Sequence, residues 1–205
     1  MEITFVRHGQ TEWNATRRYQ GRSDIPLSDE GRAQAQALAR ALAPARFDAV
    51  FASDLQRAVE TATIIAAPHG LAVQRDARIR EFDFGAWEGL TWNEIVARWP
   101  EFRDQGATAA KLYQPQGGER FEDVCDRVAS FLDDLRATRY EDVLAVTHAG
   151  VLHAVLEVLG SAIEDRPGDG LSVSFSQASV TRIAMNGEQA RLITLNDVSH
   201  LSPTA

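Results

Sequence analysis

Ile3-Thr4-Phe5-Val6-Arg7-His8-Gly9 is a short run of mostly β-branched and aromatic residues that ends in an arginine, a histidine and a glycine. Such a run predicts a buried strand that stops at the glycine. Arg7 and His8 then leave the sheet at its carboxyl edge, where open α/β sheets bind their ligands. A guanidinium beside an imidazole suits the binding of a phosphoryl group and attack on it. The alternative is that His8 only ends the strand. This stretch alone does not decide between a catalytic and a structural histidine.

A second histidine follows a second apolar run. Val143-Leu144-Ala145-Val146-Thr147 is continuously apolar up to its threonine, as in a central parallel strand, and His148 comes directly after it. The carboxyl ends of parallel strands lie at one edge of a sheet, so we expect His8 and His148 to meet there. The pair suits either a nucleophile with an anion donor or two metal ligands. Because no HxH, HExxH or CxxC pattern supplies a third ligand, we predict no metal site.

Helical segments alternate with strand-like runs along the rest of the chain. The segments with helical spacing are 32–43, 53–66, 121–137 and 151–159. A further strand is expected at 47–52, and Asn186-Gly187 is a hairpin turn between strand-like runs at 179–185 and 189–195. The alternation predicts a single domain over 1–205, a three-layer α/β sandwich with a mostly parallel central sheet and helices on both faces. The hairpin indicates at least one antiparallel edge strand.

Residues 82–118 interrupt this alternation. The segment contains Trp87, Trp92 and Trp99, with glycines and prolines between short helical pieces. We expect a smaller inserted lobe of helices and loops that forms a wall of the binding site. Trp87, Trp92 and Tyr113 hint at a substrate with an apolar or sugar face. The alternative is that the tryptophans form the core of the lobe.

Arg57 is a candidate for anion binding. Ser53-Asp54-Leu55-Gln56 resembles a capping box, which places Arg57 at the end of the first turn of a helix. The N-terminus of a helix favours anions, and an arginine there adds bidentate recognition of phosphate. The alternative is a surface ion pair with Glu60 or Asp54.

Glu81 is a candidate general acid. Aromatic residues follow it in the segment 82–87, and their burial would raise the pKa of its carboxyl group. Nearby arginines would lower that pKa, so the sequence leaves the balance open. Asp83 and Glu88 are rival candidates on chemistry alone.

The composition limits the partners of the chain. Its 205 residues carry 21 Lys and Arg against 29 Asp and Glu, a formal net charge of -8. Such a surface attracts neither nucleic acid nor an anionic membrane, and we expect neither partner. A single cysteine, Cys125, excludes an internal disulfide, and neither a secretory signal nor a membrane-length apolar run is found. We therefore expect a soluble cytoplasmic protein, and a homodimer is compatible with the sequence.

Taken in order, the motifs resemble those of the histidine phosphatase superfamily, in its phosphoglycerate-mutase-like branch. Phe5 to Asn14 is similar to the LxRHGExxxN pattern of that family, with Gln10 where glutamate is commoner. The other matching segments are 20–28, 53–62 (SxLxRAxxTA), 81–89 (ExxxGxWEG), 115–119, 146–150 and 196–201. The resemblance covers nearly the whole chain.

The resemblance implies a reaction and a role for each matching residue. His8 would be the nucleophile that becomes phosphohistidine, and Glu81 would protonate the leaving oxygen and then activate water. The implied phosphate-binding residues are Arg7, Asn14, Gln20, Gly21, Arg57 and His148. Neither a metal nor another cofactor is implied, because arginines and a histidine neutralise the phosphate charge. Arg22 is a candidate for a second anionic group of the substrate, whereas His153 is expected to be a packing or surface residue.

Three functions fit these residues. A phosphatase acting on a small phosphorylated metabolite is favoured, because the chain is compact and ends in Asn-Asp-x-x-His-Leu at 196–201. A cofactor-dependent phosphoglycerate mutase is the alternative, and an inactive binding module of the same fold is the third. Among phosphatases, candidates are an α-ribazole phosphate phosphatase and phosphatases of sugar or glycerate phosphates.

Overall fold

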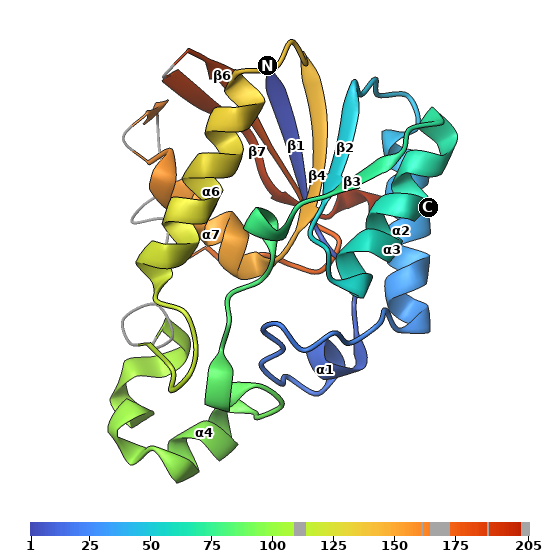
Figure 1. The fold of residues 1–205 in the computed structure, drawn as a ribbon. Coiled ribbons are helices and arrows are strands. Elements are labelled where there is room, and N and C mark those ends of the chain that lie inside the picture. Colours follow the sequence, from blue (N-terminus) through green and yellow to red (C-terminus); the bar gives the residue numbers. More distant parts are fainter. Residues whose placement is uncertain (109–113, 161, 165–172, 188, 202–205) are drawn as a thin grey trace.

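The structure is a computed structural model that describes residues 1–108, 114–160, 162–164, 173–187 and 189–201 (Figure 1). Within this part of the chain, seven strands form one sheet in the order β3-β2-β4-β1-β6-β7-β5. The strands are β1 (Glu2–Arg7), β2 (Ala49–Ala52), β3 (Val73–Arg75), β4 (Asp142–Thr147), β5 (Ile163–Glu164), β6 (Val180–Asn186) and β7 (Gln189–Asp197). The mostly parallel sheet of the prediction is confirmed.

One described strand, β6, runs antiparallel to its neighbours. It pairs with β1 on one side and, through the predicted hairpin, with β7 on the other. An antiparallel strand is present as expected, but the expectation that it lies at an edge of the sheet is wrong. β7 and the short β5 extend the sheet beyond β6, so the two edges are β3 and β5.

The central pair of strands, β1 and β4, positions the two histidines. The strands run parallel in a register that sets Arg7 opposite Thr147, and the N–H of His8 donates to the carbonyl of Thr147 at 2.9 Å. Both strands are buried on both faces, which explains why their sequences are almost continuously apolar. His8 and His148 therefore leave the sheet side by side.

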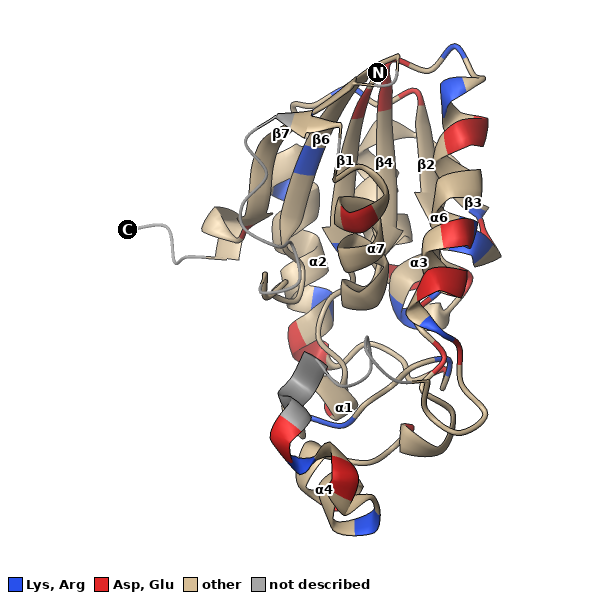
Figure 2. Cartoon of the chain, turned by 90° about the vertical axis from the view of Figure 1, so that its left-hand side faces the viewer, with Lys and Arg blue, Asp and Glu red and all other residues tan. Residues whose placement is uncertain are grey.

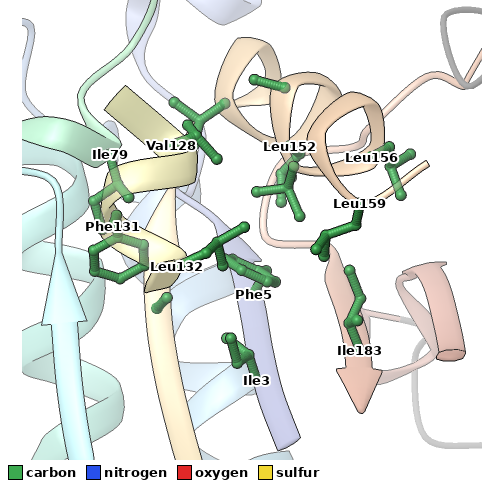
Figure 3. Packing of buried hydrophobic residues seen from close by; sticks show 14 of the residues in the cluster. Ile3, Phe5, Ile79, Val128, Phe131, Leu132, Leu152, Leu156, Leu159 and Ile183 are labelled. Carbon is green, nitrogen blue, oxygen red and sulfur yellow. The ribbon is translucent and has the colours of Figure 1, made fainter. Parts of the chain in front are cut away.

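Helices cover both faces of the sheet, which confirms the three-layer sandwich (Figure 1). The helices α2 (Asp29–Leu42) and α3 (Gln56–Ala66) lie on one face, and α6 (Phe121–Arg136) and α7 (Ala149–Val158) lie on the other. Figure 3 shows the packing on the face that α6 and α7 cover, where side chains of β1 point toward these helices. No helix in the described ranges has the length and apolar character needed to cross a membrane.

The segment 82–118 forms the expected lobe, which lies beyond the carboxyl ends of the central strands (Figure 1). Its described elements are the 3-10 helices η3 (Gly85–Trp87) and η4 (Pro100–Thr108) and the helix α4 (Trp92–Arg98). Trp87 and Ile95 are buried, and Trp92, Trp99 and other partly buried aromatic residues pack against them. The tryptophans thus form the core of the lobe. Tyr113 lies outside the described residues.

Candidate active site

His8 and His148 lie in contact at the carboxyl edge of the sheet. Their ring centroids are 5.0 Å apart, and both side chains are buried. Nδ1 of His8 lies 2.7 Å from the carbonyl oxygen of Gly9, so Nδ1 carries the proton and Nε2 keeps its lone pair. Burial, and then the charges of Arg57 and Arg7, lowers the pKa of His8 well below its usual value. The ring is therefore neutral at pH 7 and able to act as a nucleophile.

Arg57 is fully buried in the first turn of α3. Its two terminal nitrogens donate to the carbonyl oxygens of Ser23 at 2.8 Å and Gly21 at 2.7 Å. These bonds fix the plane of the guanidinium. The helix also supports the loop after β1, since the N–H of Gly9 donates to the hydroxyl of Thr61, which in turn donates to the carbonyl of Arg57.

The predicted capping box at the start of α3 is absent. Leu55 is the N-cap residue and makes no side-chain cap bond, so Arg57 is the second residue of the helix. The N–H of Gln56, which Ser53 would accept in a capping box, donates instead to Oδ1 of Asp24 at 2.7 Å, and Asp54 pairs with Arg80. The ion pair considered for Arg57 is not formed either, since Glu60 binds Arg32 at 2.6 Å.

Several buried donors near His8 have no partner in the described part of the chain. They are Nε of Arg7, Nε of Arg57 and the one ring N–H of neutral His148, neither of whose ring nitrogens has a partner. Burial lowers the pKa of Arg7 to about 10, which leaves it cationic at pH 7. Buried polar atoms are nearly always paired, so a cluster of unpaired donors indicates a site for an anionic ligand.

Glu81 lies beside this cluster and is buried. Its Oε1 accepts the N–H of Phe82 at 2.9 Å and the N–H of Gly150 at 3.1 Å. A Cβ on residue 150 would lie 2.4 Å from the same oxygen, so this close approach requires glycine. Burial raises the pKa of Glu81, while the N–H of Phe82 and the nearby arginines act in the opposite direction. A raised pKa suits proton transfer near neutral pH.

The two rival carboxylates have structural partners instead. Asp83 accepts the N–H of Gly85 at 2.9 Å and pairs with Arg22 at 3.3 Å. Glu88 accepts the N–H groups of Arg22 and Ser23 at 2.8 and 2.9 Å, and the hydroxyl of Ser23 at 2.6 Å. Glu88 therefore fastens the loop whose carbonyl oxygens hold Arg57.

A cavity of about 280 Å³ opens over these residues. Of the predicted site residues, those that line it are Arg7, His8, Asn14, Gln20, Gly21, Arg57 and Glu81. His148 lies behind the lining, against His8. Oδ1 of Asn14 accepts the N–H of Thr11 at 3.1 Å, which leaves its amide N–H groups for a ligand.

The set of residues that line the cavity differs in part from the set that the sequence predicted. Arg22 does not line it, because it is ion-paired with Glu119 at 2.6 Å as well as with Asp83. His153 packs on Phe175, as expected of a packing residue, and also lines the cavity. Lining residues that the sequence did not single out are Arg17, Arg18, Tyr19 and Phe121. Arg17 and Arg18 follow Asn14 closely. Two adjacent arginines just after the motif Phe5 to Asn14 could have been recognised in the sequence as candidates for the cavity wall.

Comparison with known proteins identifies the family. Residues 3–198 match the histidine phosphatase superfamily (branch 1). The chain belongs to this superfamily. It is similar to the putative phosphoserine phosphatase 2 of Hydrogenobacter thermophilus, with 34% identity over 97% of this chain and 96% of that protein. It is also similar to a metal-independent phosphoserine phosphatase of Arabidopsis thaliana, with 34% identity over 98% of this chain and 83% of that protein.

A solved structure agrees with this assignment. Bacillus stearothermophilus YhfR superposes with a TM-score of 0.87 and 34% identity, over 98% of this chain and 99% of that one. The fold and the resemblance inferred from the sequence motifs are thereby confirmed. The family and the names of the relatives support a phosphatase, a phosphoric monoester hydrolase, as the activity of this histidine phosphatase.

Proposed function

We propose that this histidine phosphatase hydrolyses small phosphomonoesters without a metal ion, through a phosphohistidine on His8. The observation that carries the proposal is the group of buried, unpartnered donors on residues that adjoin His8 at the cavity. Arg7, Arg57 and His148 supply these donors. A phosphoryl group offers several oxygen acceptors and a charge that two guanidinium groups can neutralise. The relatives named phosphoserine phosphatases make O-phosphoserine the first substrate to test.

In the first step, Nε2 of His8 attacks the phosphorus atom. A bond forms between this nitrogen and phosphorus while the bond from phosphorus to the ester oxygen breaks. The carboxyl group of Glu81 gives its proton to that oxygen, and the alcohol leaves. Burial favours the protonated form of Glu81 that this step needs, since it raises the pKa of the group.

In the second step, the carboxylate of Glu81 takes a proton from a water molecule, whose oxygen attacks the phosphohistidine. The bond between phosphorus and Nε2 breaks, inorganic phosphate is released and His8 returns to its neutral form. Arg7 and Arg57 hold the phosphoryl oxygens through both steps. Since phosphoryl transfer depends mainly on positioning and charge stabilisation, this set of residues suffices.

Phosphate release from a panel of phosphomonoesters in the presence of EDTA tests the proposal. We expect full activity in EDTA, no turnover for His8→Ala, and a loss of about 10²–10⁴-fold in kcat for Glu81→Gln, which cannot transfer the proton. Glu30→Gln, on the exposed surface of α2, is the control and should keep the wild-type rate. Turnover by His8→Ala, or loss of activity in EDTA, would overturn the mechanism.

A parallel assay of 3- to 2-phosphoglycerate conversion addresses the mutase alternative. A phosphatase transfers the phosphoryl group to water, so phosphate release should exceed isomerisation for every substrate of the panel. Fast isomerisation with slow phosphate release would instead identify a mutase. Absence of both, with ligand binding retained, would identify a binding module.

We also propose a cytoplasmic location and a homodimer, which cell fractionation and light scattering of the purified protein can test. The single cysteine fits a reducing compartment. Burial raises the pKa of the Cys125 thiol to about 11, so this group is protonated at neutral pH and a poor nucleophile.

A further inference from the structure

The turn after α1 (Glu12–Ala15) contains a residue in an uncommon conformation. The N–H of Arg17 donates to the carbonyl of Asn14 at 3.1 Å, and the N–H of Arg18 donates to the carbonyl of Trp13 at 2.8 Å. These bonds form a Schellman motif, in which Arg17 has the left-handed conformation, with φ of 55°. Glycine is usual at this position, because an L side chain is strained there.

The side chain that causes this strain lines the catalytic cavity. Strained residues of this kind are concentrated at functional sites, where the surrounding structure holds them in place. Arg17 is exposed at the rim, and in the described part of the chain its guanidinium has no ion pair or hydrogen bond. The neighbouring Arg18 is occupied, since it donates to the carbonyl of Gly89 at 2.6 Å and pairs with Glu94 at 2.9 Å.

The charges in the cavity exceed what a phosphoryl group requires. A phosphomonoester carries a charge of about -1.5 to -2 at neutral pH, which Arg7 and Arg57 already balance at the base of the cavity. Arg17 adds a third guanidinium at the rim, although the chain as a whole carries a net charge of -8. Figure 2 shows both acidic and basic residues on α6 and α4, so this local excess is not part of a generally basic surface.

We propose that Arg17 is a specificity-determining residue that binds a carboxylate of the substrate. The substrate class is then a phosphomonoester with a carboxylate a few bonds from its phosphoryl group. A guanidinium binds a carboxylate through two parallel hydrogen bonds, which suits a group held at the open rim. Tyr19 and Phe84 line the cavity and offer an apolar surface to the short body of such a substrate. The inference rests on the proposed phosphatase function and makes it more specific.

Two matched pairs of substrates test the role of Arg17. 3-Phosphoglycerate and glycerol 3-phosphate differ by a carboxylate in place of a hydroxymethyl group, and phosphoserine and phosphoethanolamine differ by the presence of a carboxylate. The variants are Arg17→Gly, which suits the left-handed backbone and should not unfold at a lower temperature, and Arg17→Lys, which keeps the charge. Arg46→Ala removes an exposed arginine just before β2, at the opposite edge of the sheet, and is the control.

We expect the wild-type protein to prefer the carboxylate member of each pair. Arg17→Gly should lower kcat/KM for that member about tenfold, the equivalent of one exposed charge-assisted contact, through KM and with kcat unchanged. Hydrolysis of the other member should not change, Arg17→Lys should keep part of the preference, and Arg46→Ala should behave as the wild type. An equal effect on both members, or no effect, would overturn the role of Arg17.

A binding measurement separates this inference from the proposed function. In a His8→Ala background, calorimetry compares 3-phosphoglycerate and glycerol 3-phosphate with and without Arg17→Gly. Weaker binding of 3-phosphoglycerate alone supports the carboxylate site even if no phosphatase activity is found. Equal binding of the two compounds by both proteins would exclude it, even in an active phosphatase.

Discussion

His8 and His148 are buried as neutral imidazoles, which makes stability depend on pH. Burial is the main cause that lowers the pKa of both groups, and the charge of Arg57 comes second for each. Below pH 6.5 the unfolded chain therefore binds protons that the folded chain does not bind. The stabilisation is complete above pH 6.5, the usual pKa of histidine in an unfolded chain, and is lost progressively as pH falls from 6.5 toward the lowered pKa of the folded state.

Urea unfolding at two pH values measures this linkage. Between roughly pH 7.5 and 5.5 we expect the free energy of unfolding to fall by about 1 kcal/mol for each of the two histidines. His8→Asn keeps a donor for the carbonyl of Gly9 and removes one titrating group, so its decrease should be about half as large. A variant with the same pH dependence as the wild type would contradict the buried neutral state of His8.

At the scale of single residues, the sequence predicted those site residues whose place depends on local structure. His8 and His148 each follow an apolar strand, and parallel strands bring their carboxyl ends together. The choice of Glu81 over Asp83 and Glu88 was beyond such reasoning. Asp83 and Glu88 have partners in the distant segment 22–23, and no local pattern reveals these contacts.

At the scale of elements, the lobe stabilises Arg57, the proposed phosphate-binding arginine, through a loop. Glu88 accepts three hydrogen bonds from residues 22–23, and the loop carbonyl oxygens in turn hold Arg57. A Cβ on Gly21, where φ is 53°, would lie 2.0 Å from Oε1 of Glu88, so the loop and the carboxylate are closely fitted. In the proposed mechanism, the lobe therefore contributes to catalysis without supplying a group that reacts.

Glu88→Gln tests this contribution. The amide keeps the size of the side chain but places an N–H₂ group against backbone donors, so we expect kcat/KM to fall about tenfold. Glu101→Gln, on the exposed surface of η4, should leave the activity unchanged. Because Glu88 acts through Arg57, its loss should matter little once Arg57→Ala is present. Fully additive losses in the double variant would contradict the link.

The start of α3 shows why the boundaries of elements were harder to predict than their presence. Residues 53–56 fit a capping box, and the helix itself is where the sequence placed it. However, the N–H of Gln56, the group that a cap at Ser53 would bind, donates to Oδ1 of Asp24, and the helix begins at Gln56. A hydrogen bond to a residue distant in the sequence therefore replaces the predicted local cap.

At the scale of the whole molecule, β1 joins the two halves of the core. Ile3 and Phe5 belong to the hydrophobic cluster under α6 and α7, while Val6 belongs to the cluster under α2 and α3. Figure 3 shows Phe5 among the side chains of the first cluster. The strand that leads to His8, the proposed nucleophile, is thus fixed from both faces.

Phe5→Ala measures how much stability depends on this strand. Since Phe5 is completely buried, we expect a loss of about 3–5 kcal/mol in the free energy of unfolding, measured in urea. Ile193→Ala removes a large apolar side chain that is 42% exposed and should cost less than about 0.5 kcal/mol. Similar losses for the two variants would contradict the central role of β1.

The order of the strands was the feature of the whole molecule that the sequence did not reveal. Alternating elements predicted layers and a mostly parallel sheet, but not that β6 would pair with β1 inside it. Pairing between residues 2–6 and 180–184 depends on contacts across almost the entire chain, which local periodicity does not encode.

In the proposed mechanism, the hydrogen bond from Nδ1 of His8 to its neighbouring carbonyl also decides the regiochemistry of the phosphohistidine. With one ring nitrogen engaged, the phosphoramidate can form only at the other, so a single isomer, phosphorylated at Nε2, should accumulate when hydrolysis is slowed. Phosphoramidates of histidine survive in base and decompose in acid. An alkaline quench followed by ³¹P NMR of the unfolded chain should therefore show one resonance, and an acid quench should erase it.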